Sequence, residues 1–187
     1  METKDEGTRR FHVITGGPGS GKTTLIEALR AAGFPARPEA GRSIIQDQVR
    51  IGGSALPWAD RAAFAELMLA WELRSHREAL DLSGPVFFDR SVPDVIGYLR
   101  LCGLAVPASA QTAAELFRYH PQVFIAPPWR EIFRRDQERK QTWEEAVATY
   151  EAMAETYRGL GYEIVGLPPV PADERAEFIL EVVRRGY

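Results

Sequence analysis

One motif near the N-terminus sets the order of the first structural elements of this chain. Residues 16–23 read GGPGSGKT and match the P-loop pattern at every fixed position. The apolar run 11–15 comes directly before the motif, and a helical pattern follows it. Glycines let a backbone turn its N–H groups around a polyphosphate, and the helix after such a loop presents its positive N-terminal end to the same anion. The motif therefore predicts a strand, a phosphate-binding loop and a helix, in that order.

The two side chains that end the motif have separate expected roles. The Lys22 ammonium should reach the outer phosphates of a nucleoside triphosphate, and the Thr23 hydroxyl should coordinate Mg²⁺. A dinucleotide site of the Rossmann type is excluded, because Lys22 stands where the G-x-G-x-x-G pattern needs its third glycine. We therefore expect ATP and Mg²⁺ as cofactors. The expected nucleotide-binding residues are Gly16, Gly17, Pro18, Gly19, Ser20, Gly21, Lys22, Thr23 and Thr24.

Length and composition favour one domain over residues 1–187, with a flexible N-terminus at 1–8. The net charge is −3 with both signs interspersed, so no basic field is present to hold DNA or RNA. Cys102, the only cysteine, cannot form an internal disulfide, and residues 1–10 are too polar for a signal peptide. No apolar stretch approaches the roughly 20 residues that cross a bilayer. These features predict a cytoplasmic protein without a membrane span.

Apolar runs alternate with helical patterns along the rest of the chain. Strands are expected at 11–15, 35–38, 85–88, 122–126 and 163–166. Helices are expected from the P-loop to 32 and at 41–51, 59–81, 93–101, 109–119, 129–138, 143–160 and 172–185. This alternation predicts an α/β fold whose mostly parallel sheet has helices on both faces. In such sheets the ligand lies beyond the carboxyl ends of the strands.

Asp89 and Arg90 follow the apolar strand that ends at Phe88. A carboxylate at this place can hold Mg²⁺ or take part in catalysis. The alternative for Asp89 is the N-cap of the next helix. The Arg90 guanidinium is always charged and suits an anionic or hydroxyl-bearing substrate. Its alternative is an ion pair with a neighbouring helix.

Glu39 and Arg42 come just after the second expected strand, beside the phosphate site. Glu39 is a candidate substrate ligand or general base, which would take the proton of an attacking hydroxyl or water. With equal weight, it is a carboxylate that complements the dipole at a helix start. Arg42 either pairs with Glu39 or binds a substrate phosphate.

A basic run lies between the fourth and fifth expected strands. Such a run is usually a solvated helix surface. In small P-loop phosphotransferases, however, this segment forms a mobile lid whose arginines close over the transferring phosphate. We expect a lid at 128–142, with Arg135 and Arg139 as its catalytic residues. Trp58 and Trp129 flank loops, where each either packs or contacts a ligand. The basic residues are Arg130, Arg134, Arg135, Arg139 and Lys140.

Several segments, in collinear order along nearly the whole chain, resemble one protein family. They are EAGR at 39–42, GSALPW at 53–58, FDRS at 88–91, PW at 128–129 with DQERKQT at 136–142, and LGY at 160–162 with LP at 167–168. The family is that of small bacterial predicted ATPases of the AAA-domain type that are similar to NadR. Its known members include a ribosylnicotinamide kinase domain and a eukaryotic protein that binds GTP and phospholipid.

The resemblance implies an adenylate-kinase-like fold in three layers, with a five-stranded parallel sheet ordered 2-3-1-4-5 and a helical lid. The chain lacks the second-region sensor of ring-forming AAA+ machines. Its lid sequence, 136–139, also lacks the glycine of the nicotinamide riboside kinases. The resemblance makes Glu39 and Asp89 catalytic candidates and Arg135 and Arg139 lid candidates. Lys22, from the P-loop pattern, completes the catalytic set.

Two functions from different classes fit these observations. The first is a small-molecule kinase that passes the γ-phosphoryl group of ATP to a nucleoside-like or nucleotide-like acceptor held by Glu39, Asp89 and Arg90. The second is an ATP- or GTP-dependent switch with slow hydrolysis and no acceptor. An ATPase stimulated by a partner protein is a third possibility. The Asn-Lys-x-Asp guanine motif is absent, which favours ATP, and the loop 167–171 is expected to border the base.

Overall fold

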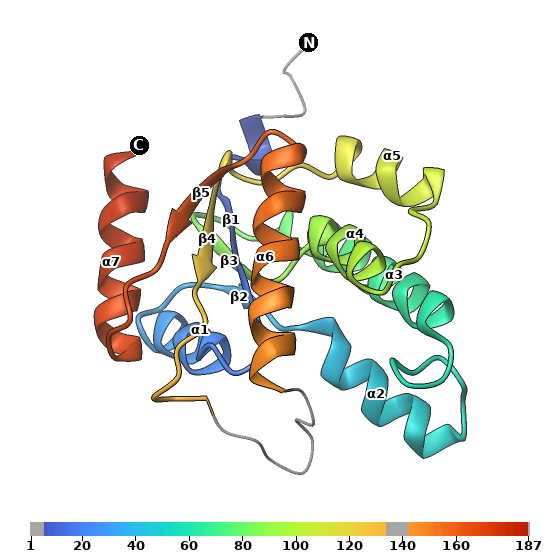
Figure 1. The fold of residues 1–187 in the computed structure, drawn as a ribbon. Helices are drawn as coiled ribbons and strands as arrows, with labels where there is room; N and C mark the ends of the chain where they lie inside the picture. The colour runs from blue at the N-terminus through green and yellow to red at the C-terminus, as the bar shows by residue number, and fades with distance from the viewer. Residues whose placement is uncertain (1–5, 134–141, 187) are drawn as a thin grey trace.

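Five parallel strands form the central sheet of the computed structural model, which describes residues 6–133 and 142–186. The strands are β1 (Phe11–Gly16), β2 (Ala36–Arg37), β3 (Val86–Asp89), β4 (Gln122–Ala126) and β5 (Glu163–Gly166). Their order is β2-β3-β1-β4-β5 (Figure 1). The central strand β1 is buried along its whole length, as a parallel strand with helices on both faces should be. The fold class and the strand order that the resemblance implies are confirmed.

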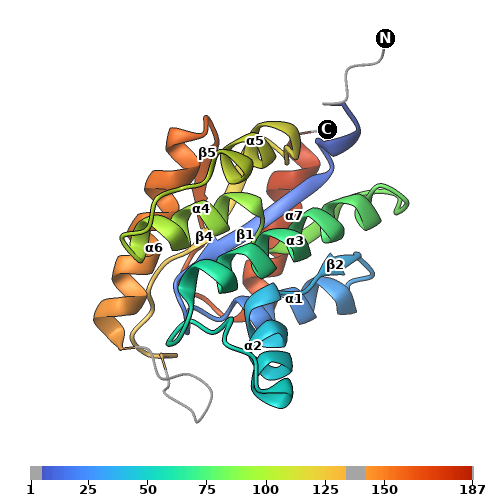
Figure 2. The ribbon, with the colours of Figure 1, turned by 90° about the vertical axis from the view of Figure 1, so that its right-hand side faces the viewer.

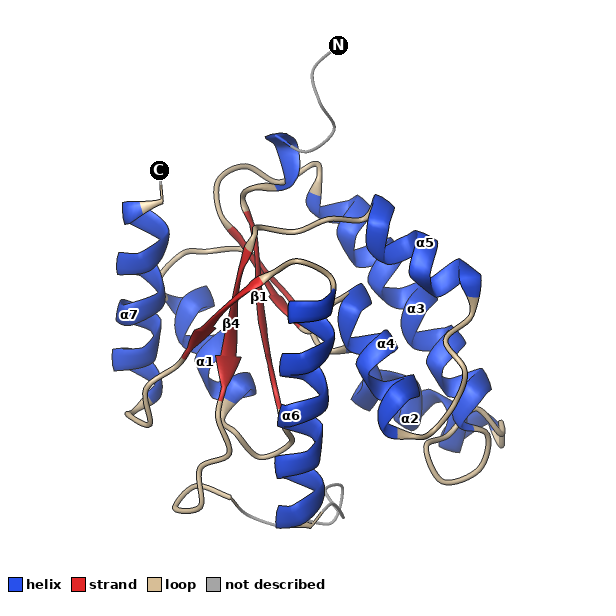
Figure 3. Cartoon of the chain, turned by 45° about the horizontal axis from the view of Figure 1, so that its top comes forward, coloured by secondary structure: helices blue, strands red, loops and turns tan. Residues whose placement is uncertain are grey.

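Helices cover both faces of this sheet (Figure 3). On one side lie α1 (Lys22–Ala31) and α7 (Ala172–Arg185), and on the other α4 (Val92–Leu101), α5 (Ala108–Leu116) and α6 (Trp143–Gly159). Successive strand residues point to opposite faces. Accordingly, Ile14 of β1 packs in the core formed with α1 and α7, and Val13 packs in the core formed with α4, α5 and α6.

Two further helices, α2 (Ala40–Ile51) and α3 (Arg61–Ala79), follow β2. α2 packs on α3, and α3 packs on α4, so these helices extend that layer to one side (Figure 2). α3 begins at Arg61 because the Asp60 side chain accepts a hydrogen bond from Ala63 N at 2.9 Å and caps the helix. Within the described ranges, no helix combines the length and the apolar character that crossing a membrane requires.

Two expected elements differ from the structure. β2 is two residues long instead of four, because Pro35 and Pro38 flank it and proline cannot donate to a ladder. The helix expected at 129–138 is wrong over its described part: residues 130–132 form a turn, and the rest lies outside the described residues. The Phe133 ring packs against Gly19 of the P-loop, so tertiary packing overrides the local pattern there.

Candidate functional site

The P-loop joins β1 to α1 and needs glycine for two separate reasons. Gly21 occupies the N-cap position of α1 with φ 80°, in the left-handed region that favours glycine. At Gly17 the reason is space, because a Cβ built there would lie 2.3 Å from the carbonyl oxygen of Ala146 in α6. The loop is therefore pressed against α6 and presents its other side to a cavity.

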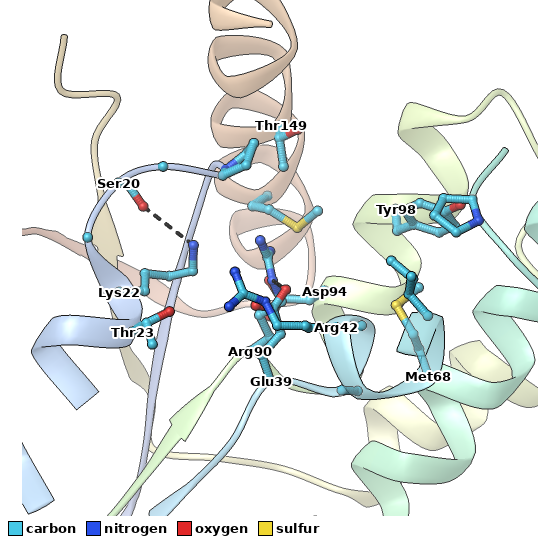
Figure 4. Close-up of a pocket in the computed structure, with 18 of the residues that line it drawn as sticks. Ser20, Lys22, Thr23, Glu39, Arg42, Met68, Arg90, Asp94, Tyr98 and Thr149 are labelled. Carbon is cyan, nitrogen blue, oxygen red and sulfur yellow. Dashed lines mark hydrogen bonds and ion pairs between the residues drawn. The ribbon is translucent and has the colours of Figure 1, made fainter. Parts of the chain in front are cut away.

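Lys22 lies inside the loop. Its Nζ donates to the carbonyl oxygen of Gly17 at 2.8 Å and to that of Gly16 at 3.3 Å, and lies 3.4 Å from Ser20 Oγ (Figure 4). Burial and the nearby charge of Arg90 lower the pKa of Lys22 to about 8. Its ammonium is therefore still mostly protonated at neutral pH and is held at the place where the P-loop pattern needs a cation.

One cavity of about 1110 Å³ connects the P-loop with α2, α3 and α4. Figure 4 shows Lys22 and Thr23 on one side, Met68 and Tyr98 on the other, and a charged group between them. The cavity thus brings together most of the residues that the sequence singles out. From the predicted set, its lining includes Pro18, Gly19, Ser20, Gly21, Lys22, Thr23, Thr24, Glu39, Arg42 and Arg90.

Asp89 is the last residue of β3 and pairs with Ile14 of β1, at the strand end where it was expected. The N-cap alternative is wrong, because Ser91 occupies the N-cap position of α4. The Asp89 side chain is buried behind the cavity lining, and its Oδ1 has no hydrogen-bond partner among the described residues. Burial and the neighbouring Glu39 raise the pKa of Asp89 to about 6, against the opposing charges of Lys22 and Arg90.

Arg90 and Glu39 form an ion pair at the middle of the cavity. Arg90 Nε donates to Glu39 Oε1 at 3.0 Å, and Arg90 itself has φ 72°, an uncommon value for a residue other than glycine. Glu39 stands at the N-cap position of α2, yet its side chain makes no capping hydrogen bond. Burial alone would raise the pKa of Glu39. The positive charges of Arg90 and Lys22 have a larger combined effect and hold this pKa below its usual value. Arg42 lines the same cavity and lowers that pKa further.

Asp94 of α4 is a site residue that the sequence reasoning missed. Its carboxylate accepts hydrogen bonds from Thr15 Oγ1 at 2.5 Å, Tyr157 OH at 2.5 Å, Ser91 N at 3.0 Å and Arg90 Nη1 at 3.2 Å. It therefore holds Arg90 through a second guanidinium nitrogen, while Nε donates to Glu39. The Ser-x-x-Asp spacing of a capping box was the signal that could have located it.

Glu72 was also missed. This carboxyl belongs to α3, is only 3% exposed and lines the cavity beside Phe64, Met68 and Tyr98. Burial, together with the acids Asp94 and Asp89, raises its pKa well above the usual value. The available signal was an acid at helical spacing on an apolar stripe, four residues after Met68.

The lid candidates fall mostly outside the described residues: Arg134, Arg135, Arg139 and Lys140 all lie within 134–141. Arg130 is described, and its guanidinium stacks 4.8 Å from the Trp143 ring centroid. Trp129 and the mostly exposed Trp58 both line the cavity. Val170 and Pro171, from the loop expected to border the base, line it as well.

Comparisons with known proteins agree with this geometry. A family model described as "AAA domain" matches residues 11–175. A search of curated proteins found no match. The crystal structure of NadR in complex with NR aligns with a TM-score of 0.66 and 18% identity, over 95% of this chain and 51% of that one. This chain therefore spans about half the length of NadR.

Two solved kinases align over nearly their full lengths. Deoxyadenosine kinase from M. mycoides with bound dATP has a TM-score of 0.64 and 13% identity, over 93% of this chain and 98% of that one. Thymidylate kinase from Candida albicans has a TM-score of 0.63 and 15% identity, over 94% and 91%. Identities this low establish the fold alone, whereas the family model covers most of the chain. The chain therefore belongs to this AAA-domain family of P-loop proteins and shares its fold with small-molecule kinases.

Proposed function

We propose that this chain is a kinase that transfers the γ-phosphoryl group of Mg-ATP to a small nucleoside-like or nucleotide-like acceptor. The observation that carries the proposal is one continuous cavity, which holds the P-loop and extends past Lys22 to the ion pair of Glu39 and Arg90. Its volume of about 1110 Å³ exceeds the 300–1,000 Å³ or so that is usual for one ligand. A donor and an acceptor would therefore fit side by side.

The P-loop forms the donor half of the proposed site. The backbone N–H groups at the start of α1 would bind the phosphates, and Lys22 would neutralise the charge of the transferred group. Thr23 lines the cavity, and Asp89, just behind the lining, has a buried oxygen without a partner in the described part of the chain. The Thr23 hydroxyl and the Asp89 carboxylate are suitable ligands for Mg²⁺. Bound there, Mg²⁺ would supply further neutralisation of phosphate charge.

Glu39 and Arg90 form the acceptor half. The low pKa of Glu39 keeps its carboxylate ionised and ready to accept the proton of an acceptor hydroxyl as that oxygen attacks the γ-phosphorus. Arg90, held by Glu39 and Asp94, would fix the orientation of the carboxylate and stabilise negative charge nearby. The apolar wall of Phe64, Met68 and Tyr98 suits the flat body of a ring-containing acceptor. The structural likeness to two nucleoside or nucleotide kinases supports the same acceptor class.

A substrate screen tests the proposal. The wild type and Lys22→Ala are incubated with Mg-ATP or Mg-GTP and panels of nucleosides, nucleotides and vitamin-like alcohols, and phosphorylated products are detected by mass spectrometry. Arg77→Ala, at an exposed position of α3, is the matched control for the loss of one positive charge. We expect a product with wild type and control and none with Lys22→Ala. Tight nucleotide binding without any product would instead favour a switch, or an ATPase that depends on a protein partner.

A further inference from the structure

Arg175 occupies an unfavourable position for a cation. It lies in the first turn of α7, where the helix dipole repels positive charge, and it is only 2% exposed. Removing a guanidinium from water is costly unless its donors are paired. Violations of local preference of this kind are expected where a residue has a functional task. The contacts of Arg175 indicate what that task is.

The guanidinium joins three separate segments. Its Nη1 donates to the carbonyl oxygen of Ser20 in the P-loop at 2.8 Å, and its Nε donates to that of Val170, just before α7, at 2.8 Å. Its Cζ lies 4.7 Å from the ring centroid of Trp129, beyond β4. Its Nη2 is buried and has no hydrogen-bond acceptor within residues 6–133 and 142–186. Arg175 therefore ties the P-loop to the segment before α7 and to Trp129.

The bond to Ser20 has a direct consequence for the phosphate site. The Ser20 carbonyl and the Gly21 N–H belong to one trans peptide unit, so they point in opposite directions. By holding the carbonyl, Arg175 sets the direction of the Gly21 N–H. Gly21 lines the cavity and is the N-cap residue of α1, where phosphate-binding N–H groups gather. Glycine on its own would leave this peptide free to rotate.

We propose that Arg175 is a positioning residue of the nucleotide site, which orients the Ser20–Gly21 peptide of the P-loop toward the phosphates. The inference rests on the proposed nucleotide site but not on any acceptor. It predicts that Arg175 contributes to the binding of the polyphosphate itself, so its effect does not depend on the presence of a base.

The test measures binding of two probes by calorimetry: Mg-ATP and inorganic tripolyphosphate with Mg²⁺, which has no base. We expect Arg175→Met to weaken both by about tenfold to a hundredfold, the range for loss of a charged hydrogen bond. Arg175→Lys keeps the positive charge but cannot make all three contacts of the guanidinium at once, so it should weaken the binding of both probes by a smaller factor. Arg184→Met, at an exposed position of the same helix, is the control. Melting temperatures are recorded for every variant.

Each outcome separates one explanation from another. If Arg175→Met lowers the melting temperature but Arg175→Lys, with its fold intact, binds both probes like wild type, Arg175 is structural only and the inference is wrong. Weaker binding of ATP with unchanged binding of tripolyphosphate would assign Arg175 to the nucleoside and also overturn it. If the wild type binds neither probe, the proposed function fails and the inference fails with it.

Discussion

Arg90 Nε lies 3.0 Å from Glu39 Oε1, an ion pair that joins the end of β3 to the start of α2. Both residues follow strands at the same edge of the sheet, 51 positions apart in the chain. The pair holds Glu39 in its ionised form and places it on the wall of the cavity that also contains the P-loop. An ionised carboxylate at this place can take up the proton of an attacking hydroxyl, which is the role that we propose for Glu39.

The first prediction concerns Glu39 as this base. Glu39→Gln keeps the shape of the side chain and can still accept a hydrogen bond from Arg90, but it cannot take up a proton. We expect kcat for phosphoryl transfer to fall about 10²-fold to 10⁴-fold, with the Kd for ATP nearly unchanged. Glu27→Gln, on the exposed face of α1, is the matched control. Steady-state kinetics with a phosphorylated product as readout would show full turnover in Glu39→Gln if the assignment is wrong.

The second prediction concerns Asp94. The Asp94 carboxylate accepts hydrogen bonds from four donors, and Asp94→Asn replaces one of its oxygens by an amide N–H₂ that itself donates. The backbone N–H of Ser91 cannot rotate away from this new donor. We expect the free energy of unfolding to fall by about 1–3 kcal/mol, the cost of an unsatisfied buried group. Because Arg90 loses an ionic partner, kcat should fall as well. Urea titration and kinetics measure the two effects, with the exposed Asp81→Asn as control. A variant as stable and as active as wild type would contradict the role given to Asp94.

The sequence predicted the parts of the molecule that depend on local pattern. The P-loop spacing located β1, the loop and α1, and alternating apolar runs located the remaining strands. Glu39 and Arg90 were correctly expected near each other, because parallel strands end at one edge of the sheet. Their direct pairing was not predicted, since the sequence offered Arg42 as the partner of Glu39 and left open whether Arg42 binds a substrate phosphate instead.

The missed residues depend on contacts between distant segments. The Asp94 carboxylate is held by Thr15, 79 positions away, and by Tyr157, 63 positions away. Arg175 reaches Ser20 across 155 positions. Nothing in the local sequence around these residues shows these distant partners. The helix expected at 129–138 failed for the same reason, because Phe133 packs on Gly19 of the P-loop.

The third prediction concerns His12, a buried residue of β1 whose ring stacks 4.6 Å from that of His120. Burial, with a smaller contribution from His120, lowers the pKa of His12 to about 3. Between pH 6.5 and about 3 the unfolded chain therefore binds a proton that the folded chain does not, and stability falls as pH falls. From pH 7 to pH 5 this amounts to about 2 kcal/mol. In urea titrations His12→Phe should lose less stability over this interval than wild type; an equal loss would rule out His12 as the cause.

The fourth prediction has the opposite sign and concerns Glu72. Its pKa is raised in the folded protein, mainly by burial, so the folded chain keeps a proton that the unfolded chain releases above its ordinary pKa. Stability then falls as pH rises through this range. Glu72→Gln has no such proton, so its free energy of unfolding should change less than that of wild type between pH 5 and pH 8. Urea titrations of both proteins at the two pH values measure the difference, and Glu66→Gln, at an exposed position of α3, should behave like wild type. If the free energy of unfolding changes equally with pH in wild type and Glu72→Gln, the Glu72 carboxyl is already ionised in the folded protein. The cavity would then present an anion to the acceptor.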